Sequence, residues 1–149
     1  MDYPSIAISV QQPWAFFLVN GFKPVENRTW PIPEKYRGAR VLIQASARPL
    51  FPLAAARETL AEMHARYGIP GGWRFPELGR DVGGIVGMVR LVGCTRDHVS
   101  PWAIRGQWHW QAAEAQPLAF MPCKGQLGFF RVDYTLARAE QGSLMGGAA

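Results

Sequence analysis

The side chains best suited to chemistry are concentrated between residues 23 and 30, where Lys23, Glu26, Arg28 and Trp30 lie close together. Lysine and arginine can grip a phosphate or a polar base edge, arginine through two parallel hydrogen bonds. A carboxylate can accept a hydrogen bond from an exocyclic amine or transfer a proton. An indole can stack on a base, which is worth ~1–3 kcal/mol per base. This combination indicates a nucleotide or nucleic-acid site, but a surface hairpin with one Glu–Arg pair, worth ~0–1 kcal/mol, fits the spacing equally well.

The elements around this cluster are expected to bring further polar side chains to it. Residues 26, 28 and 30 alternate, so an extended segment places all three on one face. Gln11, between the first strand and the first helix, either reads a base edge or caps the helix, and capping is slightly favoured. Ser46, at the end of a strand, either lines the same cleft or is structural. Trp14 opens the helix and is included among the candidate binding residues.

Hydrophobic periodicity predicts strands separated by short helices. Strands are expected over residues 5–10, 26–30, 39–46, 83–93, 107–111 and 126–134, and helices after Pro13 and over 53–67. Glycines 83, 84 and 87 suit a bend or bulge. This order favours a mixed α+β fold, a small closed or nearly closed β-barrel with flanking helices, over a doubly wound sheet. Residues 136–149 are expected to form a flexible tail.

Composition limits the classes of function. The chain has 149 residues and a net charge of +5, which suits one domain attracted to polyanions. It carries no apolar run of membrane length and no signal-peptide pattern, so we expect a cytoplasmic protein with no membrane partner. Its cysteines form no CxxC pair and its histidines lack metal-ligand spacing, so we expect neither a metal nor a cofactor. The sequence leaves the oligomeric state open.

The same residues resemble a known family. Ser9-Val10-Gln11-Gln12-Pro13-Trp14-Ala15, followed by the GxKxxExR pattern of residues 21–28, is similar to the opening of the ASCH domain. The resemblance continues through Tyr36-Arg37-Gly38 and the strand ending at Ser46, and reaches Gly125-Gln126-Leu127-Gly128-Phe129-Phe130. It implies a PUA-like β-barrel over residues 4–135, with the motif in a cleft suited to RNA or a nucleotide.

Members of this family are linked to nucleic-acid binding, to hydrolysis of N4-acylcytidine and to metal-dependent ribonuclease activity. In the amidohydrolase branch a lysine is followed three residues later by a threonine nucleophile. Lys23 matches the lysine, but Glu26 occupies the threonine position, and Thr29 lies too far along. We therefore favour a module that binds RNA, single-stranded nucleic acid or a nucleotide. A hydrolase, in which Lys23 and Glu26 are catalytic, is the alternative.

Overall fold

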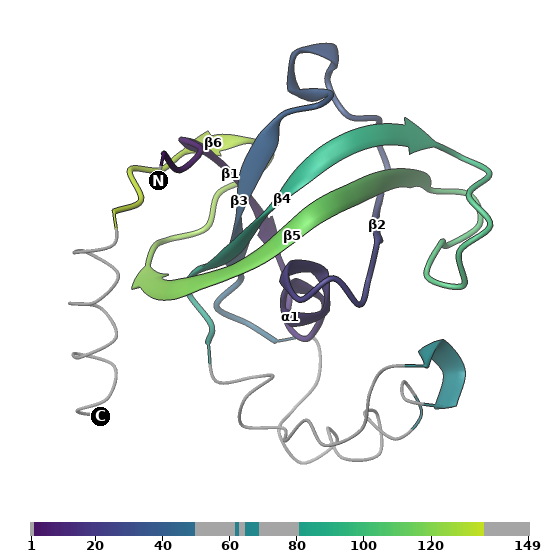
Figure 1. Cartoon of the computed structure of the whole chain (residues 1–149), viewed down its shortest axis with the longest axis horizontal. Helices are drawn as coiled ribbons and strands as arrows, with labels where there is room; N and C mark the ends of the chain where they lie inside the picture. Colours follow the sequence, from purple (N-terminus) through teal and green to yellow (C-terminus); the bar gives the residue numbers. More distant parts are fainter. Residues whose placement is uncertain (1, 50–61, 63–64, 69–80, 136–149) are drawn as a thin grey trace.

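A single mixed sheet with short helices forms the domain in the computed structural model, which describes residues 2–49, 62, 65–68 and 81–135 (Figure 1). The sheet has six strands in the order β2-β5-β4-β3-β1-β6. The elements in chain order are β1 (Ile6–Val10), α1 (Trp14–Val19), β2 (Val25–Arg28), the 3-10 turn η1 (Glu34–Tyr36), β3 (Arg40–Ala45), β4 (Gly84–Thr95), β5 (Trp108–Pro122) and β6 (Phe130–Arg131). The described part of the chain is therefore mostly β.

One parallel pair interrupts an otherwise antiparallel sheet. β1 and β3 run parallel, with Ala7 opposite Leu42 and Val10 opposite Ala45, and every other neighbouring pair is antiparallel. The carboxyl ends of β1 and β3 therefore meet at the same edge, and the residues that follow both strands lie close together.

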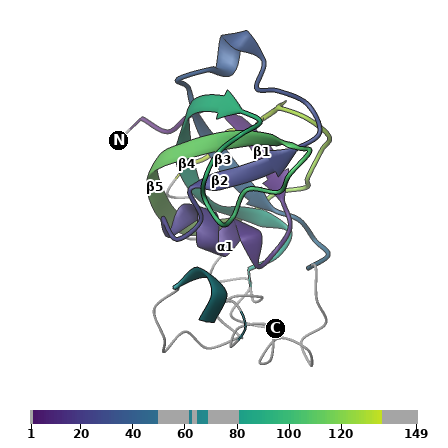
Figure 2. The same cartoon turned by 90° about the vertical axis from the view of Figure 1, so that its right-hand side faces the viewer.

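The long β4–β5 ribbon bends over the short helix α1 (Figures 1 and 2). The ladder shifts register around Gly87, as the glycines of this strand predicted. Gly87 leaves room for both β5 and the helix, because a Cβ there would lie 2.6 Å from the carbonyl oxygen of Gln116 and 2.6 Å from the side chain of Val19. Leu18 and Val19 pack into the core with Trp110, which is fully buried. No helix of the described ranges is long and apolar enough to cross a membrane.

The structure corrects two strand predictions. The strand expected over 107–111 continues to Pro122, and the strand expected over 126–134 is reduced to Phe130–Arg131. Two side chains help to hold the chain before β6, beside the backbone bond from the Cys123 N–H to the carbonyl of Gly83 at 3.0 Å. Gln44 Nε2 donates to the carbonyl of Cys123 at 2.8 Å, and Ser9 Oγ donates to that of Gln126 at 3.3 Å.

Two other expectations are only partly covered. Within the described ranges no ladder joins β2 to β6, so the strand pairing shows a curved sheet with two end strands and does not show closure into a barrel. Most of the helix predicted over 53–67 lies outside the described residues, although its last turn, Ala65–Tyr67, is helical. The tail predicted over 136–149 also lies outside them.

Candidate nucleotide-binding cavity

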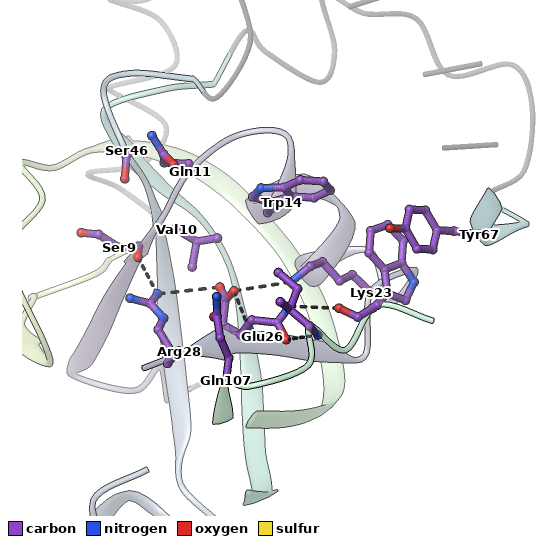
Figure 3. A pocket seen from close by; sticks show the side chains of 13 residues that line it. Ser9, Val10, Gln11, Trp14, Lys23, Glu26, Arg28, Ser46, Tyr67 and Gln107 are labelled. Carbon is purple, nitrogen blue, oxygen red and sulfur yellow. Dashed lines mark hydrogen bonds and ion pairs between the residues drawn. The ribbon is translucent and has the colours of Figure 1, made fainter. Parts of the chain in front are cut away.

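A cavity of about 450 Å³ opens where the carboxyl ends of β1 and β3 face β2. Gln11 follows β1 and Ser46 follows β3, and the Ser46 N–H donates to the carbonyl of Val10 at 3.0 Å. Six of the seven side chains proposed from the sequence line this cavity: Gln11, Trp14, Lys23, Glu26, Arg28 and Ser46 (Figure 3).

Lys23 is held rigidly at the cavity between α1 and β2. Gly21, with a φ of 79°, ends the helix in the left-handed conformation that glycine tolerates, and the Lys23 N–H then donates to the carbonyl of Phe17 at 3.0 Å. The side chain is only 4% exposed. Its ammonium donates to the carbonyl of Val25 at 2.6 Å and to Glu26 Oε1 at 3.4 Å. Lys23 is therefore a buried cation, not the exposed one that a surface hairpin would carry.

Glu26 lies between the two cations on β2. Its Oε1 accepts from Lys23 and from the Asn27 N–H, the latter at 3.1 Å. Its Oε2 is 3.7 Å from an Arg28 terminal nitrogen and has no hydrogen-bond partner within the described ranges. Arg28 is one-quarter exposed and donates to the carbonyl of Ser9 at 2.8 Å. Two cations share one carboxylate, so this group of three side chains keeps one positive charge, which attracts an anion to the cavity.

Aromatic rings line the side of the cavity nearest Lys23. The ammonium lies 5.8 Å from the ring centroid of Trp14 and 6.0 Å from that of Trp102. These two indoles meet edge to face at 5.9 Å, and Tyr67 stacks on Trp102 at 3.7 Å with an interplanar angle of 10°. This aromatic wall, defined as Trp14, Tyr67 and Trp102, places ring surface beside the charged group.

Trp30 is the proposed site residue that the structure does not bring to the cavity. β2 ends at Arg28, so the alternation that would have carried position 30 onto the same face stops two residues earlier. Its ring instead meets Trp110 at 4.9 Å and Phe129 at 6.0 Å, and its carbonyl accepts the Trp110 indole N–H at 2.9 Å. Trp30 packs against the core.

Several cavity residues were not singled out from the sequence. They are Ser9 and Val10 on β1, Asn27 on β2, Tyr67, and, from the segment between β4 and β5, Trp102, Ile104 and Gln107. Asn27 lies within the GxKxxExR pattern of residues 21–28, and Ser9 begins the family-like segment that runs to Ala15, so a sequence signal existed for both. Trp102 lies in a segment without periodicity, and no short-range pattern connects it to residue 23.

Metal ligation and thiol chemistry are the other two possibilities in the described part of the chain. No group of three or more His, Cys, Asp and Glu side chains in the described ranges could hold a metal ion. Cys94 and Cys123 are free thiols, and neither lines the cavity.

Comparisons with known proteins agree with this fold. Residues 8–120 match the family model of the ASCH domain. An ASCH protein from Zymomonas mobilis, solved by crystallography, superposes with a TM-score of 0.53 at 14% identity, covering 94% of this chain and 93% of that one. A point mutant of the Zymomonas protein gives 0.52 at 13% identity, covering 94% and 95%. No curated protein matches the sequence. At such identities the structural likeness shows the fold alone.

Proposed function

The chain belongs to the ASCH domain family, of PUA-like fold, and from this premise we propose that its cavity binds one nucleotide unit, carried by single-stranded RNA or free in solution. The observation that carries the proposal is the placement of an incompletely neutralised Lys–Glu–Arg group against an aromatic wall inside one cavity. A nucleotide has the two matching parts, an anionic phosphate and a flat ring.

The charged group favours the phosphate. Arg28 is exposed enough to meet a ligand and carries several donors, of which one nitrogen is engaged by Ser9. Lys23 adds a fixed positive charge behind it, where low exposure limits screening by solvent. The cavity volume lies within the range of about 300–1,000 Å³ that small-molecule sites occupy, so one nucleotide unit rather than a duplex fits it.

The alternative, a hydrolase acting on nucleic-acid components, needs a nucleophile or an activated water. The cavity offers Ser9 and Ser46 as aliphatic hydroxyls, but Ser9 Oγ donates to Gln126, and the Lys23 ammonium is engaged by Val25 and Glu26. Among the residues that the structure describes, no hydrogen bond joins either serine hydroxyl to a base. Binding is therefore the function that we carry forward, and turnover is an outcome of its tests.

Replacing Arg28 tests the proposal. Arg28→Gln removes the charge and shortens the side chain but leaves it polar, and should weaken binding of fluorescein-labelled single-stranded RNA by about 10- to 150-fold, equivalent to the ~1.5–3 kcal/mol of hydrogen bonds to charged groups. Arg40→Gln is the matched control. Arg40 also donates one bond to a backbone carbonyl, that of Asp2 at 3.0 Å, but it does not line the cavity. Equal effects of the two variants on fluorescence anisotropy would contradict the proposal.

A further inference from the structure

The segment between β4 and β5 carries one side of the cavity without forming a helix or a strand. Residues 96–107 supply Trp102 and Ile104 to the cavity. Bonds inside the segment give it local shape, since the Trp102 N–H donates to Ser100 Oγ at 3.2 Å and the Ser100 N–H donates to His98 Nδ1 at 3.0 Å. Such bonds do not fix where the segment lies relative to the sheet.

Asn27 attaches the segment to β2 through both ends of its side-chain amide. Its Nδ2 donates to the carbonyl of Trp102 at 2.9 Å, and its Oδ1 accepts from the N–H of Ile104 at 2.9 Å. One side chain therefore fixes the backbone on both sides of residue 103. No apolar residue could supply this pair of bonds.

His109 attaches the same segment from β5. It stands directly opposite Asn27 in the β2–β5 ladder and is 3% exposed. Its Nδ1 accepts from the His98 N–H at 3.1 Å, so the proton is on Nε2, which donates to the carbonyl of Ile104 at 2.7 Å. Ile104 is thus held through its N–H by one strand and through its carbonyl by the other.

We infer that Asn27 and His109 form a cross-strand pair of positioning residues, which place the Trp102 segment at the cavity and thereby set its preference for ligands with a flat ring. The identity of the ligand in this inference rests on the proposed function, whereas the placement of the Trp102 segment by Asn27 and His109 is independent of it. Trp102 is 6% exposed and is enclosed by Trp14, Phe17 and Tyr67, so its location determines how the aromatic wall is packed. The hydrogen bonds and ion pairs of Lys23 and Arg28 come from β1 and β2, so the charged group keeps them when the segment loosens and loses only the Trp102 ring that lies 6.0 Å from the Lys23 ammonium.

This division of roles gives the pair a distinctive signature. Loosening the segment removes ring contacts with a base, while the cations still attract phosphate. Asn27→Ala should therefore weaken binding of labelled single-stranded RNA by about 5- to 150-fold, the range for one stacked base. A strand of the same length whose residues lack bases should lose clearly less affinity, because its phosphates still meet Lys23 and Arg28.

The matched control is Asn20→Ala. Asn20 Nδ2 also donates to a backbone carbonyl, that of Phe16 at 2.8 Å, but Asn20 lies at the end of α1 and does not line the cavity. One further variant grades the effect. His109→Gln keeps one donor and one acceptor. It should fall between wild type and Asn27→Ala.

Indole N–H signals in NMR spectra of the ¹⁵N-labelled protein report on positioning without any ligand. The Trp102 signal, assigned with Trp102→Phe, should shift or broaden in Asn27→Ala and not in Asn20→Ala. The Trp110 signal, from an indole bonded to Trp30, should stay in place in both. An unchanged Trp102 signal in Asn27→Ala, or equal weakening of both strands, would overturn the inference. If the wild type binds neither strand, the proposed function fails and the Trp102 signal alone decides the positioning claim.

Discussion

Replacing Glu26 by glutamine should destabilise the domain while sparing its affinity for a polyanion. The carboxylate lies 3.4 Å from the Lys23 ammonium and 3.7 Å from an Arg28 nitrogen. At an effective dielectric constant of about 20, each attraction is worth about 4–5 kcal/mol before desolvation. Breaking a buried pair costs about 3–5 kcal/mol. We expect the low end, about 3 kcal/mol, because glutamine still accepts from the Asn27 N–H and Arg28 is partly exposed.

Thermal unfolding followed by circular dichroism measures this loss. For a chain of this size, about 3 kcal/mol corresponds to a fall in Tm of about 6–12 °C. Glu114→Gln is the matched control, since Glu114 pairs with Arg90 where both side chains are well exposed and such pairs contribute about 0–1 kcal/mol. RNA affinity of Glu26→Gln should be unchanged or higher, because a negative charge leaves the cavity. If Glu26→Gln and Glu114→Gln have the same Tm, the description of Glu26 as a buried link between two cations is refuted.

Three further predictions concern binding, packing and pH. RNA affinity should fall as the salt concentration is raised, because protein cations displace counterions from phosphates. Deleting residues 137–149 should not change the affinity. Fluorescence anisotropy titrations at several salt concentrations check both expectations. Gly87→Ala should lower the free energy of unfolding by ~1–3 kcal/mol in urea unfolding, because the added methyl meets the backbone of Gln116 and the side chain of Val19 on the helix. Gly93→Ala is the control and should cost less, because its nearest contact is 3.2 Å away on the flexible side chain of Gln111. Burial, with a smaller effect from Tyr3, raises the pKa of Tyr134 above its ordinary value of about 10, so the stability that this hydroxyl contributes is complete below pH ~10 and is lost as the pH rises through the folded-state pKa. Tyr134→Phe should reduce this loss of stability at alkaline pH, and should cost ~1 kcal/mol at neutral pH because the hydrogen bond to the Ala119 carbonyl is lost. Unfolding curves measured across pH 8–11 test this. An equally steep fall of stability with pH in Tyr134→Phe and wild type would contradict it.

The charged part of the cavity was predictable because its geometry is local. Lys23, Glu26 and Arg28 lie within six residues, and one strand with the turn before it brings them together. Gln11 and Ser46 follow two strands whose parallel pairing puts them at one edge. What the sequence left open is burial. A surface hairpin and a binding cleft fit the spacing of residues 23–30 equally well, and in the structure Lys23 is buried with the indoles of Trp14 and Trp102 close to its ammonium.

The aromatic part was not predictable, for two physical reasons. The side-chain period of a strand holds only while the strand lasts, so ending β2 at Arg28 turns Trp30 away from the cavity and against the core. Trp102 reaches the cavity through hydrogen bonds from Asn27, 75 residues earlier in the chain. Bonds between distant side chains and an irregular segment leave no periodic pattern in the sequence. The docking of residues 123–126 ahead of the shortened last strand leaves none either.

Binding of a nucleotide in the cavity is tested most directly by titrating unlabelled single-stranded RNA into ¹⁵N-labelled protein. We predict progressive shifts in the backbone amides of Gln11, Asn27 and Ser46 and in the Trp102 indole, with little change at Arg131. Arg131 lines a second, smaller hollow beside Tyr3 and Tyr134 and is therefore the internal reference. Shifts confined to that hollow, or binding that leaves all four cavity signals unmoved, would contradict the central claim.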